Sequence, residues 1–166
     1  MEFEIIFGLS ILIIIALAVV ILNSNKKNKK KQFIKLLYDF AEKSNCKISE
    51  HDLWNNTLIG IDNDRYKLFF IRMSGENAVK NEIDLQGIQK CRVINSNRVV
   101  TLKEGTHTVT DKIELALTSP DVKTGDTILE FYNTNRDNLF LNGELQLTEK
   151  WAEIVNANIA SISQKR

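Results

Sequence analysis

Residues that carry most enzyme and metal chemistry are scarce in this chain. It contains two cysteines, two histidines and one proline among 166 residues. The cysteines, Cys46 and Cys91, stand far apart in the sequence and form neither a zinc-ligand pair nor a redox motif. No phosphate-binding loop, dinucleotide-binding glycine motif, zinc-protease motif or nucleophile-elbow motif is present. The sequence therefore predicts no catalytic residue, no cofactor and no metal site.

The densest cluster of titratable side chains is Glu50, His51 and Asp52. Adjacent residues of a strand point to opposite faces, and metal sites usually draw ligands from several elements. We therefore interpret this cluster as a solvated turn, and we place His107 in a hairpin tip. The alternative is a membrane-tethered enzyme, in which a hidden acid–base or metal site combines the cluster with His107.

One long apolar run stands out against this composition. Ile5 to Leu22 contains eighteen residues without a charge, and about 20 apolar residues span a bilayer as a helix. The run is apolar on every side, which disfavours the alternative of a helix buried in a soluble core. A cleaved signal peptide is a second alternative, but Glu2 and Glu4 stand where such a peptide carries basic residues. We predict a transmembrane anchor over residues 1–25.

A polybasic segment over residues 26–31 follows the run. Its lysines are Lys26, Lys27, Lys29, Lys30 and Lys31. Because basic residues stay on the cytoplasmic side of a span, we predict a single-pass protein of the inner (cytoplasmic) membrane, with the N-terminus outside and the C-terminal domain in the cytoplasm. We interpret these membrane-proximal basic residues first as a topology signal, with contact to anionic lipid headgroups of the bilayer as the alternative. In the cytoplasm, both cysteines are expected to be reduced; an inverted topology leaves one disulfide open.

The remaining segment, residues 32–166, is expected to form a single soluble domain. Five of the 22 basic residues lie in segment 26–31 and two of the 21 acidic residues precede the apolar run, so this domain has a net charge of −2. A nucleic-acid-binding domain presents a basic face. The mild acidic excess with mixed signs therefore argues against nucleic acid as a partner.

Two amphipathic helices are predicted in this domain. The first is Gln32 to Ser44, where apolar residues recur with the helical period of 3.6 residues. Its polar face carries both signs of charge, which favours packing on a sheet over lying along the membrane. The second is 149–163, with Thr148 as its N-cap and Trp151 in its apolar stripe.

Short apolar segments separated by polar turns lie between the two helices. Segments 57–61 and 65–73 flank the turn Asp62-Asn63-Asp64 and are expected to form a hairpin, with 65–73 central because both of its faces are apolar. A second hairpin is expected around Asn95-Ser96-Asn97. The remaining predicted strands are 82–85, 88–94, 98–102, 112–118 and 127–132.

A run of about seven antiparallel strands closed by one C-terminal helix resembles the pleckstrin-homology (PH) superfamily. In that superfamily a Trp near the start of the helix packs over the open end of the strand barrel, and Trp151 occupies a matching place as a structural helix-cap core residue. The resemblance covers residues 46–163, and the helix 32–44 departs from it. The turn that it matches to the phosphoinositide-reading loop of some members is Asp62-Asn63-Asp64. That turn is acidic, so the resemblance implies protein docking rather than lipid binding.

These observations predict an α+β protein with an N-terminal transmembrane helix, an amphipathic helix, six or seven mostly antiparallel strands in a PH-like barrel or sandwich, and a C-terminal helix. No catalytic constellation accompanies this pattern. The predicted function is therefore that of a protein-binding or scaffolding module held at a membrane, with a protein partner that the sequence does not identify.

Overall fold

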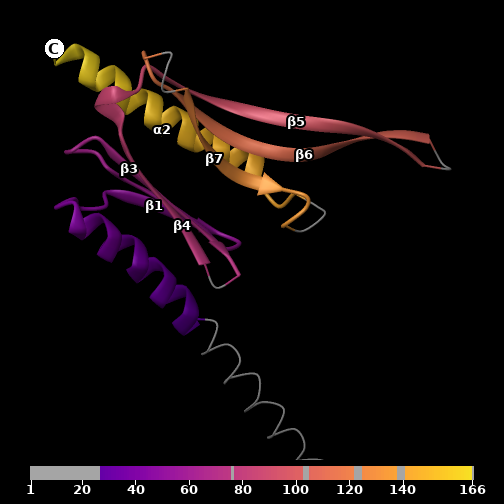
Figure 1. The fold of residues 1–166 in the computed structure, drawn as a ribbon, viewed down its shortest axis with the longest axis horizontal. Helices are drawn as coiled ribbons and strands as arrows, with labels where there is room; N and C mark the ends of the chain where they lie inside the picture. The colour runs from indigo at the N-terminus through magenta and orange to yellow at the C-terminus, as the bar shows by residue number, and fades with distance from the viewer. Residues whose placement is uncertain (1–26, 76, 103–104, 122–124, 138–140, 166) are drawn as a thin grey trace, which may run out of the picture.

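The computed structural model describes residues 27–165, apart from 76, 103–104, 122–124 and 138–140. Along these residues the chain forms a helix over 27–43, seven strands, a short 3-10 helix and a final helix (Figure 1). The strands make two antiparallel sheets, of four and three strands. The described part of the protein is thus an α+β structure built on two sheets.

The first sheet contains four strands in sequence order. They are β1 (Glu50–Trp54), β2 (Thr57–Asp62), β3 (Lys67–Ser74) and β4 (Asn77–Asp84). β3 lies between β2 and β4 and is buried from Leu68 to Arg72, because both faces of the sheet are covered at this point. The turn predicted after β2 is present. Asp62 stabilises it by accepting hydrogen bonds of 2.9 Å from the backbone N–H groups of Asp64 and Arg65.

The second sheet follows the short 3-10 helix η1 (Leu85–Gly87). It contains β5 (Lys90–Leu102), β6 (Gly105–Thr118) and β7 (Asp126–Asn133). The hairpin predicted around Asn95-Ser96-Asn97 is wrong, because β5 runs through these residues without turning. A β-bulge between Ser96 and Asn97 shifts the register of the pairing between β5 and β6. Polar residues are tolerated at the bulge because this part of the strand is exposed.

The helix over residues 27–43 packs on the outer face of the first sheet, as its mixed polar face indicates. Leu37 and Ala41 are fully buried there, against Leu58 and Phe69. The helix lies so close that a Cβ at Gly60 of β2 would stand 2.9 Å from the Cδ2 atom of Leu37. The described helix includes residues 27–31, because lysine is a good helix former.

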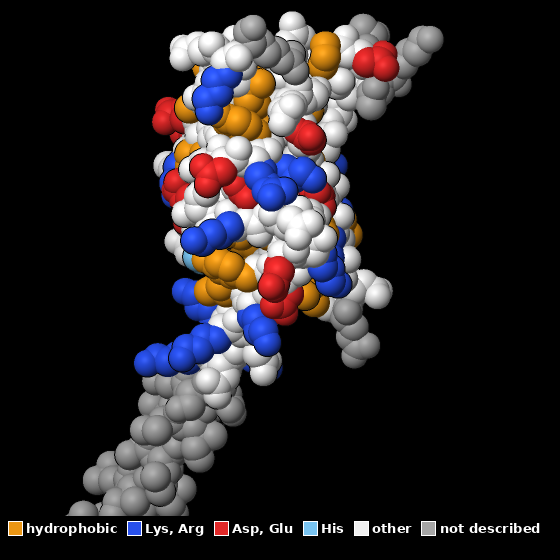
Figure 2. Space-filling view, turned by 90° about the vertical axis from the view of Figure 1, so that its left-hand side faces the viewer, with side chains coloured by type: hydrophobic (Ala, Val, Ile, Leu, Met, Phe, Trp, Pro, Cys, Tyr) orange, Lys and Arg blue, Asp and Glu red, His pale blue; other side chains and the backbone are white. Residues whose placement is uncertain are grey.

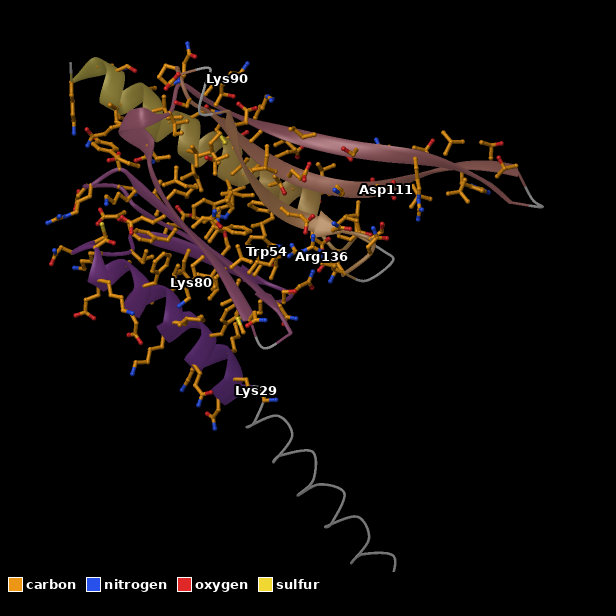
Figure 3. The ribbon with its side chains drawn as sticks, viewed as in Figure 1. Lys29, Trp54, Lys80, Lys90, Asp111 and Arg136 are labelled. Atoms are coloured by element: carbon orange, nitrogen blue, oxygen red, sulfur yellow. The ribbon has the colours of Figure 1, made fainter. Side chains whose placement is uncertain are left out.

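The main core fills the space between the two sheets and the final helix α2 (Glu144–Gln164). Trp54 joins the sheets: its indole stacks on Phe131 with ring centroids 4.5 Å apart, and its Nε1–H donates to the Phe131 carbonyl at 2.9 Å (Figure 3). α2 begins five residues earlier than the sequence indicates. Thr148 is therefore buried inside the helix, where its hydroxyl donates to the Glu144 carbonyl at 2.7 Å instead of capping.

The predicted fold class and location need correction. Among residues 27–165, as far as the structure describes them, no helix combines the length and the apolar character that crossing a membrane requires. Both helices carry charged side chains along one face, and this keeps that face in contact with water. The predicted span 5–22 lies outside the described residues. The structure therefore corrects two predictions, the transmembrane component of the fold and the single-pass inner-membrane location.

Candidate binding groove

The cluster Glu50, His51 and Asp52 belongs to strand β1 rather than to a solvated turn. Lys150 of α2 donates to Glu50 and Asp52, with Nζ–O distances of 2.8 and 2.7 Å. His51 instead packs edge-on against Tyr38, with ring centroids 5.6 Å apart. His107 lies in β6 opposite Val100, on a hairpin that projects away from the first sheet (Figure 1). The structure does not bring these four residues together.

The cluster therefore acts as a structural link between β1 and α2. The hydrogen bond to Asp52, followed by the one to Glu50, raises the pKa of Lys150. Asp52 also accepts a 2.9 Å hydrogen bond from the Nε1–H of Trp151, whose side chain is completely buried. The part of the chain that the structure describes holds no group of three or more potential metal ligands.

The two cysteines are free and buried. Burial raises the pKa of the Cys91 thiol to about 12. Burial also raises the pKa of Cys46, and the nearby Asp62 carboxylate adds to that increase. Because a thiolate is the reactive form, neither side chain is prepared for nucleophilic chemistry.

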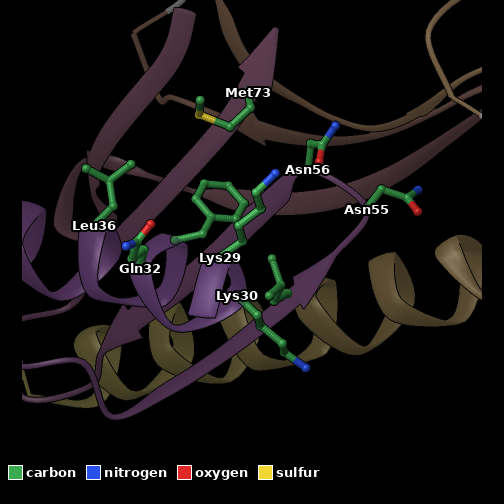
Figure 4. A pocket seen from close by; sticks show the side chains of 9 residues that line it. Lys29, Lys30, Gln32, Leu36, Asn55, Asn56 and Met73 are labelled. Carbon is green, nitrogen blue, oxygen red and sulfur yellow. The ribbon is translucent and has the colours of Figure 1, made fainter. Parts of the chain in front are cut away.

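An open groove lies between the helix 27–43 and one end of the first sheet (Figure 4), with a volume of about 940 Å³. Its apolar lining comes from the helix, from β1 and from β3, through Phe33, Leu36, Leu53 and Met73. Its polar lining consists of Lys29, Lys30, Gln32, Asn55 and Asn56. The nine lining residues include two cations and no carboxylate.

The apolar floor is exposed because the helix extends past the end of the sheet. Phe33 and Leu36 lie on the same side of the helix as the buried Leu37, yet both stay half-buried. β1 ends at Trp54, and among the described residues no further strand of the sheet lies over them. Figure 2 shows basic side chains gathered where the described chain begins, with apolar surface directly beside them.

The predicted basic segment contributes to this rim. Lys27, Lys29, Lys30 and Lys31 are exposed on the helix, and two of them line the groove. Lys26 lies outside the described residues. Their contact with anionic lipid headgroups stays a prediction.

One wall of the groove is the turn Asn55-Asn56 between β1 and β2. Asn55 has a positive φ of 43°, which asparagine tolerates better than most residues, and its side-chain amide donates to Glu144 of α2 at 3.1 Å. The Asn56 carbonyl accepts a 2.9 Å hydrogen bond from the backbone N–H of Met73. The turn that joins the first two strands is thus Asn55-Asn56, whereas the acidic turn at 62–64 joins β2 to β3. The sequence matched the acidic turn to the phosphoinositide-reading loop of the PH superfamily, which is the first loop. That match is corrected, because the acidic turn is the second loop of the sheet.

A buried ionic cluster supports this wall from behind. The Arg72 guanidinium donates to the Glu130 carbonyl at 2.7 Å and to the Asp137 carboxylate at 2.8 Å, and Arg72 is only 8% exposed. A smaller hollow of about 240 Å³ lies beside Arg72 and shares Asn56 and Met73 with the groove. The cluster therefore fixes β3, β7 and the turn after β7 relative to the groove wall.

Comparison with protein-family models, with curated proteins and with solved structures finds no match to this chain. The nine lining residues of the groove include two lysines and three side-chain amides, and no histidine, cysteine or carboxylate. The arrangement can hold an apolar side chain on its floor and an anionic group at its rim.

Proposed function

We propose that this chain is a protein-binding module whose groove takes a short segment of a partner protein. The observation that carries the proposal is an open apolar floor beneath a rim with two lysines and no carboxylate. Exposed apolar surface with a polar border is characteristic of interaction sites on proteins. Catalysis has no comparable support among the described residues.

The lining indicates the chemistry of the partner segment. A volume of about 940 Å³ lies in the range of about 300–1,000 Å³ that binding clefts occupy, and it accommodates one or two large apolar side chains. Lys29 and Lys30 favour acidic residues beside those side chains and increase the rate of encounter with them. We therefore expect a segment with a Leu, Ile, Met or aromatic anchor flanked by Asp or Glu.

The groove wall is held before any partner arrives. The Asn55-Asn56 turn is joined to α2 through Glu144 and to β3 through Met73. Groups that are already ordered lose little conformational entropy on binding, so a pre-formed site binds more tightly than a flexible one of the same composition.

Membership of the PH superfamily stays a proposal. Sheets of four and three antiparallel strands, a closing C-terminal helix and a fully buried Trp151 support it. The helix 27–43, which forms one side of the groove, is the feature that the resemblance does not include.

Site-specific photo-crosslinking tests the proposed function. A photoreactive residue replaces Gln32 at the groove rim, and the control places it at Glu42, exposed on the same helix but absent from the groove lining. Irradiation in the cells that make the protein is expected to give a discrete adduct from position 32 only. The cross-linked peptide is expected to contain an apolar residue with acidic neighbours. Equal adducts from the two positions, or none from position 32, would contradict the proposal.

A further inference from the structure

The hairpin of β5 and β6 extends well beyond the rest of its sheet. β7 pairs with β6 only from Lys112 to Thr118, and the last contact is a 3.0 Å hydrogen bond from the Thr134 backbone N–H to the Asp111 carbonyl. Beyond that point β6 pairs with β5 alone, through residues 105–110. Among the described residues, no strand pairs with the other edge of this segment. We call residues 97–110 of the hairpin the arm.

The hydrogen bond from Thr134 to Asp111 joins the base of the arm to the end of β7, and an ion pair joins the two strands of the hairpin there. Arg98 and Asp111 form an ion pair of 2.9 Å between β5 and β6. Figure 3 places Asp111 where the arm leaves the body of the domain. The arm extends away from the body of the domain, clear of both helices (Figure 1).

The free β6 edge lacks two features that commonly keep edge strands apart, charged side chains and proline. Natural sheets protect exposed edges with charged residues or proline. The β6 segment 105–110 is Gly-Thr-His-Thr-Val-Thr, which contains neither. By contrast, the outer strand of the first sheet, β4, carries Lys80 and Glu82, and β5 carries Lys90 and Arg92.

We propose that two copies of this chain associate by antiparallel pairing of this free β6 edge, residues 105–110 of each copy. Alternate residues of an edge strand direct their backbone N–H and C=O groups outward, so a second strand satisfies both sets at once. The second copy's strand would continue the ladder that β7 leaves at Lys112. The occupant is thus the same segment from another molecule.

The segment is complementary to itself. Antiparallel pairing around a two-fold axis sets residues of this segment opposite residues of the same segment, so its three threonines and Val109 meet one another or Gly105 and His107. Such β-branched cross-strand pairs stabilise a sheet, and no acidic or lysine side chain meets its like. Val99, on the β5 strand of the arm, is 68% exposed and adds apolar surface beside the new strand pair. A dimer through six residues per copy is small, so it depends on protein concentration.

Disulfide trapping tests this pairing in the full chain. Thr106→Cys, His107→Cys, Thr108→Cys and Val109→Cys are compared with Thr101→Cys, which lies on the β5 strand of the same arm opposite Thr106. The native cysteines are buried, so they remain silent. Mild oxidation is expected to give a covalent dimer with a maximum at one β6 position, since a two-fold axis brings one residue closest to its own copy. A yield no higher than that of Thr101→Cys at every β6 position would overturn the proposal.

A charge substitution gives an independent check. Thr108→Lys brings one lysine from each copy together across the two-fold axis, so the dimer dissociation constant is expected to rise about tenfold in analytical ultracentrifugation. Thr101→Lys, the control, is expected to leave it unchanged. An equal response of both variants would overturn the pairing. The groove plays no part in either readout, so this result and that of the photo-crosslinking can fail separately.

Discussion

Replacing Arg72 by Gln is expected to lower the free energy of unfolding by about 3 kcal/mol. The Arg72 side chain is 9% exposed, and its partners Asp137 and Glu130 are 13% and 16% exposed. Removal of the cation takes away the counter-charge that contacts the nearly buried Asp137 carboxylate, and it leaves Glu130 paired with the exposed Arg136 alone. Such a loss costs about 3–5 kcal/mol, because the remaining charges are already desolvated.

The lower end of that range applies because the carboxylates keep other donors. Asp137 still accepts a 2.8 Å hydrogen bond from the backbone N–H of Asn133, and Glu130 still accepts one of 2.6 Å from the Asn133 side chain. These bonds satisfy part of the capacity of each carboxylate. They do not neutralise its charge.

Arg136→Gln is the matched control. Arg136 also faces Glu130, with an N–O distance of 3.4 Å, but its side chain is 55% exposed. Water screens that pair, so its removal is expected to cost no more than about 1 kcal/mol. The two variants thus compare a buried and an exposed arginine beside the same Glu130 carboxylate.

Urea unfolding followed by circular dichroism measures both variants. For Arg72→Gln the urea concentration at the unfolding midpoint is expected to fall strongly. The dependence of the unfolding free energy on urea concentration is expected to stay the same, because the fold itself is retained. Free energies of unfolding for the two variants that agree within about 0.5 kcal/mol would refute the assignment of Arg72 as a buried support of the groove wall.

Three further predictions concern the packing of the domain. Burial would raise the pKa of Asp62, but three backbone N–H donors lower it overall. The stabilising effect of the carboxylate is therefore present above about pH 4 and lost as pH falls through the lowered pKa. Asp62→Asn is expected to destabilise the protein more at pH 6 than at pH 3 in urea unfolding, and an equal loss at both pH values would contradict this. Gly60→Val is expected to cost about 1–3 kcal/mol by pushing on Leu37, measured by thermal unfolding, and a neutral result would show that the helix is not packed there. Cys46 and Cys91 are expected to resist a thiol reagent in the native state and to react fully in urea; rapid native labelling would refute their burial.

Sequence patterns predict the buried elements of this fold better than the exposed ones. The apolar period of the helix face that contains Leu37 and the two apolar faces of β3 both reflect burial, and the structure places them in the core. β4 is predicted only at its end, because residues 77–81 lie on an exposed outer strand where Ala78 and Val79 are adjacent and leave no alternating signal. The predicted turn at 95–97 fails for a related reason: polar residues also occur in an exposed strand with a bulge.

Sequence patterns do not predict the groove, because its opening depends on where strand β1 ends relative to the helix 27–43. Phe33 and Leu36 look like ordinary core residues of an amphipathic helix, and in the described part of the chain they line the groove because β1 ends beside them. Arg72 looks like one polar residue in an apolar strand. Its partners, Glu130 and Asp137, are 58 and 65 positions away in the sequence. Such contacts are set by tertiary structure, which no local period encodes.

The most direct test of the central claim, that the groove binds an apolar segment with acidic neighbours, is a measurement of affinity. Short random peptides are selected on the full chain, and the best one is titrated by fluorescence anisotropy against two double variants. Lys29→Glu with Lys30→Glu changes the groove rim, while Lys27→Glu with Lys31→Glu makes the same charge change on the same helix outside the groove lining. The selected peptide is expected to have an apolar anchor and acidic flanks. Its affinity is expected to fall at least about tenfold for the first double variant and far less for the second. Equal losses for the two variants, or a peptide without acidic residues, would contradict the claim.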